Sequence, residues 1–125
     1  MPLISGLRVA YTPDPSDAKM ISNLIIHCQA TTLTATPTFL KMILASSSPH
    51  PSPLPGGEGT INLLQTLRYG VVGAEKFPES LFESFTKFCP EGKILEGYGI
   101  TECSPVISIN PPKLPKRGSV GLPIE

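Results

Sequence analysis

Apolar residues recur along the chain at two different spacings, and their alternation predicts an α/β fold. Apolar positions three or four residues apart, the spacing of an amphipathic helix, run over residues 15–28, 37–44 and 78–88. Short runs rich in β-branched and apolar residues, which favour strands, occupy residues 7–11, 31–35, 67–72, 93–95 and 106–109. Because parallel neighbours need a crossover helix, this order predicts a mostly parallel sheet flanked by helices.

Two positions are typical of helix starts. Asp14 is expected to cap a helix from Pro15 to about Cys28, and Thr36 to cap one that begins at Pro37. Such side chains accept hydrogen bonds from first-turn N–H groups, and proline fits the first helical position. The first and third helices are expected to turn apolar faces to the core, formed by Met20, Leu24, Ile25 and Cys28, and by Leu81, Phe82, Phe85 and Phe88.

The segment at residues 46–59 reads SSSPHPSPLPGGEG and predicts a loop inside residues 1–125, which we expect to form part of one domain. Prolines at alternate positions remove backbone donors, so neither a helix nor a strand ladder is favoured. We interpret it as a spacer or a low-complexity insertion, and a segment for a proline-binding partner is the alternative. A short helix near residues 61–67 is expected to follow it, and residues 118–123 are expected to close the chain as a turn.

Composition narrows the class of partner. The chain has 125 residues, enough for one domain or part of one, and its 10 basic and 10 acidic residues cancel. This balance gives no footprint for nucleic acid or an anionic membrane. The apolar runs are too short to span a bilayer and the start lacks a secretory pattern, so we expect no transmembrane segment and a cytoplasmic location.

The cysteines and histidines are not spaced like the ligands of a metal site or the members of a catalytic dyad. Cys28, Cys89 and Cys103 are odd in number and far apart, which indicates reduced thiols, while a catalytic cysteine has little support. His27 lies in an apolar helical stretch and His50 among prolines. We expect both histidines to be structural or solvated.

The strongest candidate for a ligand site is the segment that contains Gly97, Tyr98, Gly99, Thr101 and Glu102. The fixed pattern Y-G-x-T-E arises by chance on the order of once in a thousand chains of this length. A strand that ends near residue 95 would let the ring of Tyr98 lie on a purine, while the glycines admit the ligand to the backbone. Thr101 could then donate to a phosphate, and Glu102 could hold Mg²⁺ directly or through water. The alternative is a glycine turn with a half-buried tyrosine and a solvated Thr and Glu.

A second glycine segment follows the preceding strand. Gly73, Ala74 and Glu75 come after residues 67–72, and ligands of open parallel sheets bind beyond the carboxyl ends of the strands. Neighbouring strand ends would bring this segment and Gly97–Gly99 to one rim, with backbone groups of the first at the edge of a base. Each segment alone is a common glycine turn.

Four blocks of the sequence carry a resemblance to a known superfamily. They are TPTFL at 36–40, LRYGVVGAEKFPESL at 67–81, ILEGYGITECSPVISIN at 94–110 and GSVGLP at 118–123. The chain resembles the middle of the N-terminal domain of adenylate-forming, AMP-binding enzymes, which include acyl-CoA synthetases, luciferases and peptide-synthetase adenylation domains. It looks most similar to bacterial acyl-[acyl-carrier-protein] synthetases, including the 2-acylglycerophosphoethanolamine acyltransferase type.

The resemblance implies roles for the same residues. In the family, the positions of Tyr98, Thr101 and Glu102 stack on adenine, contact the α-phosphate and bind Mg²⁺. The segment Gly73–Glu75 lines the adenine pocket, and the backbone of Gly97–Gly99 lies near the acyl group. The implied reaction joins a fatty acid to ATP as an acyl-adenylate, after which a thiol of acyl-carrier protein or CoA displaces AMP. Such chemistry needs positioning and charge neutralisation more than a covalent side chain.

The family's phosphate loop, a ribose-binding Asp and the lysine-bearing C-terminal domain have no counterpart in this sequence. We therefore expect an internal fragment of such a ligase, inactive in isolation and prone to self-association through an unpaired sheet edge. A non-catalytic remnant or interaction module with at most weak adenine-nucleotide binding is the alternative. A complete small α/β domain of unrelated function is a third.

Overall fold

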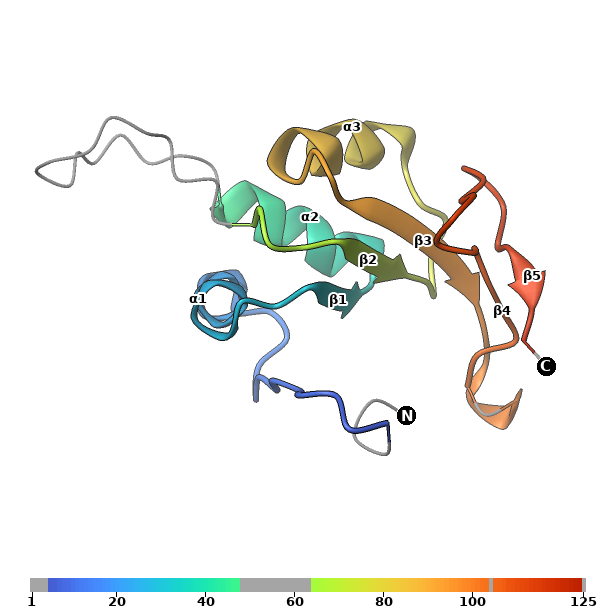
Figure 1. The fold of residues 1–125 in the computed structure, drawn as a ribbon, viewed down its shortest axis with the longest axis horizontal. Helices are drawn as coiled ribbons and strands as arrows, with labels where there is room; N and C mark the ends of the chain where they lie inside the picture. Colours follow the sequence, from blue (N-terminus) through green and yellow to red (C-terminus); the bar gives the residue numbers. More distant parts are fainter. Residues whose placement is uncertain (1–4, 48–63, 104, 125) are drawn as a thin grey trace, which may run out of the picture.

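The computed structural model describes residues 5–47, 64–103 and 105–124. Three α-helices, five strands and one short 3₁₀ helix alternate along these residues (Figure 1). In chain order they are α1 Ala18–Cys28, β1 Thr32–Ala35, α2 Pro37–Ser46, β2 Tyr69–Val72, α3 Glu79–Phe88, β3 Lys93–Tyr98, η1 Thr101–Cys103, β4 Ser108–Ile109 and β5 Leu122–Pro123. The predicted α/β class is confirmed.

The five strands form one sheet in the order β1-β2-β3-β4-β5. The ladders β1–β2 and β2–β3 are parallel, and the shorter ladders β3–β4 and β4–β5 are antiparallel. The parallel part therefore contains the two connections that pass through α2 and α3. The predicted parallel sheet is present, and a short antiparallel extension follows β3.

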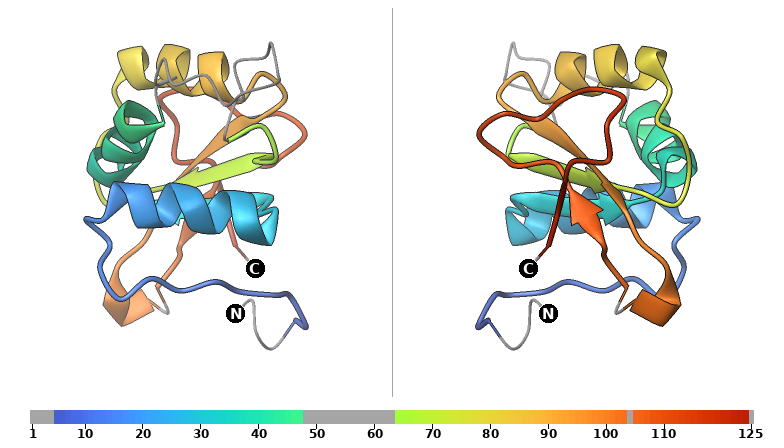
Figure 2. Two further views of the ribbon diagram at one scale, coloured as in Figure 1. Left: turned by 90° about the vertical axis from the view of Figure 1, so that its left-hand side faces the viewer. Right: turned by 90° about the vertical axis from the view of Figure 1, so that its right-hand side faces the viewer.

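The helices cover one face of the parallel strands. Figure 2 shows α3 above the strands and α2 beside them, and α2 packs against both α1 and α3. A hydrophobic core fills the space between helices and sheet, with Leu40, Ile43 and Phe85 almost fully buried. Gly70 in β2 lets Phe85 and Ile94 approach, since a Cβ there would lie 2.8 Å from Ile94 Cδ1. Burial of this apolar area is the main force that holds the layers together.

Local sequence signals position α2 and α3 as expected. The Thr36 hydroxyl accepts a hydrogen bond from Phe39 N at 3.3 Å, and Pro37 takes the first helical position. The expected aromatic stripe of α3 lies in the core, with Phe82 and Phe85 buried and Phe88 packed against them.

The start of α1 differs from the prediction. Asp17, rather than Asp14, caps the helix and accepts from Met20 N at 2.9 Å. The Asp14 carboxylate instead accepts from both the backbone and the hydroxyl of Ser16, which closes a turn before the helix and lowers the pKa of Asp14. Two aspartates three residues apart compete for one cap, and the turn at Ser16 decides between them.

The buried face of α1 is also rotated from the prediction. Ile25 is buried as expected, but Met20 and Cys28 are exposed and Ser22 is buried in their place. The Ser22 hydroxyl donates to Ala18 O and lies 3.1 Å from Ser47 Oγ at the end of α2. A buried polar contact between helices cannot be read from apolar spacing.

The strand expected at residues 7–11 is absent from the described structure. Leu7 is 61% exposed and Tyr11 is 72% exposed, and residues 7–11 pair with none of the strands in the described structure. Residues 64–66 form a turn where part of a short helix was expected, and β5 occupies part of the expected closing turn. Most of the proline-rich loop at 46–59 lies outside the described residues.

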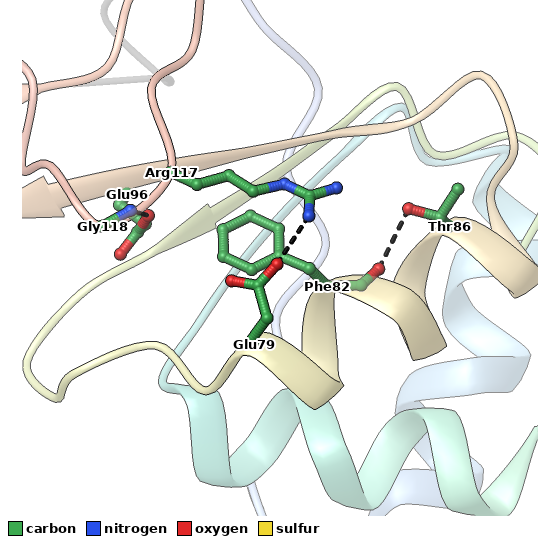
Figure 3. Close-up of polar contacts among 6 residues, drawn as sticks. All are labelled: Glu79, Phe82, Thr86, Glu96, Arg117 and Gly118. Carbon is green, nitrogen blue, oxygen red and sulfur yellow. Dashed lines mark hydrogen bonds and ion pairs between the residues drawn. The ribbon is translucent and has the colours of Figure 1, made fainter.

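The chain after β4 folds back over β3 and α3. Asn110 is 2% exposed, and its Nδ2 donates to Glu96 O while its Oδ1 accepts from Lys116 N. Gly118 N donates to the Glu96 carboxylate at 2.8 Å. Figure 3 shows Arg117 reaching α3, where it pairs with Glu79 at 2.6 Å. These contacts hold the segment between β4 and β5 against β3 and α3.

Within the described ranges, no helix has the length and apolar character needed to cross a bilayer.

The hydroxyl of Ser108 is buried without a hydrogen-bond partner among the described residues. An unsatisfied buried hydroxyl opposes folding, so Ser108→Ala should keep or raise the free energy of unfolding measured with urea. The matched control is Ser22→Ala, which removes a satisfied buried hydroxyl and should lower that free energy by about 0.5–1.5 kcal/mol. A larger loss for Ser108→Ala than for Ser22→Ala would contradict this assignment.

The three thiols should differ in reactivity. Cys89 is 1% exposed, and burial raises the pKa of its thiol to about 11, whereas Cys28 and Cys103 are exposed. Since the thiolate is the reactive form, iodoacetamide at pH 8 should label Cys28 and Cys103 and leave Cys89 unmodified until the chain is unfolded. Peptide mass spectrometry before and after denaturation measures this order, and rapid labelling of Cys89 in the folded chain would contradict it.

Candidate functional site

The carboxyl ends of the three parallel strands lie at one edge of the sheet (Figure 1). Ala35, Val72 and Glu96 are aligned across β1, β2 and β3 in the ladder register. The segments that follow each strand therefore start side by side. We call the first turn of α2, the loop Gly73–Glu75 and residues 97–102 the strand-end rim.

The two glycine segments of the rim touch, as the sequence predicts. A Cβ atom built on Gly73 would lie 3.1 Å from the carbonyl oxygen of Gly97, so the backbones approach closely. The next residue, Ala74, has a φ of 71°, in the left-handed region that non-glycine residues rarely adopt. Such strain is held in place by surrounding contacts and is common at functional sites.

Tyr98 lies at the end of β3, with its side chain 51% exposed. The expectation of a strand that ends near residue 95 is wrong. Beyond Leu95, Glu96 still pairs with Val72 of β2, and Gly97 and Tyr98 pair with Ile109 and Ser108 of β4, so β3 continues for three more residues. Ile107 N donates to Tyr98 O at 2.9 Å and fixes the backbone that carries the ring. The ring is therefore presented at the rim from a paired strand.

Gly99 occupies a position that no other residue would fit. A Cβ atom there would collide with the carbonyl oxygen of Pro105. The chain turns at this point into η1, whose Cys103 N donates to Ile100 O at 3.0 Å. Glycine here allows the turn that separates the Tyr98 ring from the polar residues after it.

Thr101 and Glu102 lie in η1 and are exposed. Neither side chain makes a hydrogen bond to another residue in the described part of the chain. The structure thus places both on the same rim as Tyr98 without fixing them in a network. Free donor and acceptor groups of this kind are available to a ligand.

One contact of the rim was not predicted from the sequence. Thr38 Oγ1 donates to Glu75 Oε2 at 2.9 Å, which links the first turn of α2 to the loop after β2. Thr38 lies within the TPTFL block, but nothing in that block names its partner. The contact depends on two strands being neighbours, which is a property of the sheet rather than of either segment.

The rim fits an adenine nucleotide in several respects. It offers a half-exposed aromatic face, an exposed hydroxyl and an exposed carboxylate, whereas neighbouring backbone fills the space beside Gly73, Gly97 and Gly99. For a metal ion the fit is narrower, because the residues described here contain no group of three His, Cys, Asp or Glu side chains that could surround it. Mg²⁺ is often held by one or two carboxylates together with substrate phosphates, which Glu102 alone could satisfy in part.

Residues 1–125 match the model of the family described as AMP-binding enzyme. The chain belongs to this family. It is 43% identical over 61 residues to a long-chain-fatty-acid–CoA ligase of Yersinia pestis, a match that covers 47% of this chain and 10% of the ligase. It is 53% identical over 32 residues to the enzyme of the same name from Salmonella typhimurium strain LT2, covering 25% of this chain and 6% of that protein.

Solved structures agree on the fold. The chain superposes on the anthranilate CoA ligase AuaEII in complex with anthranoyl-AMP with a TM-score of 0.73 and 23% identity, covering 95% of this chain and 21% of that one. For the long-chain-fatty-acid-CoA ligase FadD1 from Archaeoglobus fulgidus the TM-score is 0.69 at 20% identity, covering 86% and 21%. The chain thus has the fold of a part of the N-terminal domain of adenylate-forming enzymes and spans at most a quarter of the proteins named here.

Proposed function

We propose that this chain contributes the adenine-binding rim of an ATP-dependent fatty acid–thiol ligase. The observation that carries the proposal is the meeting of the loops after β2 and β3, with the half-exposed ring of Tyr98 at the same edge. Membership of the AMP-binding family and the ligase names of the bacterial relatives support the same class. The reaction proposed is attack of a carboxylate on the α-phosphate of ATP, which forms an acyl-adenylate and releases pyrophosphate. A thiol then attacks the acyl carbonyl, which forms the thioester and releases AMP.

The proposed roles follow from the chemistry of each group. Tyr98 stacks on adenine, since an aromatic face binds a purine through stacking. Thr101 donates to the α-phosphate, and Glu102 holds Mg²⁺ that neutralises the charge of the reacting phosphates. The backbone of Gly73 and Ala74 lies at the edge of the base, and the backbone of Gly97 to Gly99 lies near the acyl group.

The acceptor thiol is proposed to belong to acyl-carrier protein, with CoA as the other candidate. The sequence blocks resemble acyl-carrier-protein synthetases, whereas the relatives matched here are named for CoA.

Substitutions at the rim test the proposed roles in a chimera that carries this chain in place of its counterpart in the Yersinia pestis ligase. Tyr98→Ala should weaken ATP binding by about 1–3 kcal/mol, the usual contribution of one base stacked on an aromatic ring. Glu102→Gln should leave the Kd nearly unchanged and lower the rate of adenylation, because Mg²⁺ loses its charged ligand. Equilibrium binding and ATP–pyrophosphate exchange give the two quantities, and wild-type values in both variants would contradict the roles.

The 125-residue chain alone should show no ATP–pyrophosphate exchange, while AMP should still perturb the amide resonances around Tyr98. Single electrostatic donors are typically worth about 10²–10³ in rate, and the proposed site contains neither a phosphate loop nor a lysine for the reacting phosphate. Measurable exchange would refute the need for those groups. If AMP shifted the rim amides of the wild-type chain no more than those of the Tyr98→Ala variant, the adenine-binding role would be refuted.

A further inference from the structure

The hydrogen bond between Thr38 and Glu75 joins two parts of the rim that lie 37 residues apart in sequence. Glu75 ends the loop after β2, and Thr38 belongs to the first turn of the helix after β1. Through this contact the segments after all three parallel strands form one continuous edge. Gly73 packs on Gly97 at one end of the loop, and Glu75 reaches α2 at the other.

The α2 end of this contact is rigid. Pro37, Leu40 and Ile43 are buried, so the helix is fixed by the core immediately after Thr38. The preceding residue, Thr36, satisfies Phe39 N and sets the direction of the first turn. A carboxylate is also favoured next to a helix N-terminus, where the peptide dipoles leave partial positive charge. The helix therefore offers Glu75 a fixed donor and a favourable field.

The loop between these two anchors carries backbone strain. Ala74, with its φ of 71°, is directly preceded by the close backbone approach of Gly73 and directly followed by the bonded carboxylate of Glu75. A non-glycine residue keeps such a conformation only where its surroundings impose it. The close approach of Gly73 and the hydrogen bond of Glu75, whose side chain and partner are both exposed, lie on either side of this residue.

We propose that Thr38 and Glu75 are a positioning pair that holds the Gly73–Ala74 backbone at the edge of the bound adenine. In this proposal, which rests on the adenine-binding function above, the Glu75 carboxylate acts on the nucleotide only through the loop. Thr38 is then a positioning residue that the sequence motifs do not assign. In this proposal the Glu75 side chain does not touch the nucleotide; it fixes the conformation of the loop instead.

The test uses the whole 125-residue chain with AMP as the probe. Thr38→Val removes the hydroxyl and keeps the shape, Thr38→Ser keeps the hydroxyl, and Glu75→Ala removes the acceptor. Thr86→Val is the matched control, because the Thr86 hydroxyl donates to Phe82 O within α3, away from the rim (Figure 3). Backbone ¹⁵N relaxation at Gly73 and Ala74 measures loop order without ligand, and the shift of rim amides on AMP titration measures affinity.

Thr38→Val and Glu75→Ala should each lower the order parameters of the loop amides and raise the AMP Kd about threefold to tenfold, as loss of one hydrogen bond allows. The double variant should match the single ones, because both remove the same interaction. Thr38→Ser should restore wild-type loop order, and Thr86→Val should not change it.

Three results overturn the inference. They are a Thr38→Val variant that behaves like Thr86→Val, a Thr38→Ser variant that fails to restore loop order, and additive effects of Thr38→Val and Glu75→Ala. If the wild-type chain does not bind AMP, the adenine-binding function fails, and the loop order of the Thr38 variants alone then decides whether the pair positions the loop.

Discussion

The parallel register of β1, β2 and β3 is the constraint on which the rest of the molecule depends. It aligns Ala35, Val72 and Glu96, so the three segments that follow begin at one edge. A slip of one residue would reverse the faces of a strand and expose side chains such as Val72, which the helices cover. Core packing on one face therefore fixes where loops meet at the edge, and any binding at the rim inherits its geometry from that packing.

The antiparallel extension has a different role from the parallel strands. It is short, but it pairs with Gly97 and Tyr98 and keeps these last two residues of β3 extended. Asn110 ties this extension to Glu96 and to the segment that ends at β5. Without these contacts the residues from Gly97 onward would form a flexible glycine-rich loop. The extension converts that loop into a supported platform for the aromatic ring.

The sequence predicted features that depend on local chemistry and missed those that depend on distant partners. The cap at Thr36 and the aromatic stripe of α3 follow from side chains within one turn of each other. The sequence predicts the strand at 106–109 that contains β4, but not its pairing with Gly97 and Tyr98, so β3 continues past the predicted end near residue 95. The apolar run at 7–11 predicts a strand, but in the described structure these residues are mostly exposed and pair with no strand.

The candidate site shows the same division. Tyr98, Gly73 and the residues of η1 could be named from motifs, and their common edge from the order of strands and helices. The bond from Thr38 to Glu75 could not, because a threonine at the second position of a helix is unremarkable until its neighbour in the sheet is known. Motifs identify groups that meet a ligand, whereas groups that orient them are found through tertiary contacts.

Magnitudes indicate how the rim can act. Stacking on one half-exposed ring supplies about 1–3 kcal/mol, which is less than the ~4.1 kcal/mol that corresponds to a millimolar Kd. Adenine binding at the rim therefore needs the backbone edge of Gly73 and Ala74 in addition to the ring, and it loses affinity if that edge is free to move. In the proposed site, the contacts of Gly73 with β3 and of Glu75 with α2 favour binding by reducing the conformational entropy that the loop would lose when adenine binds.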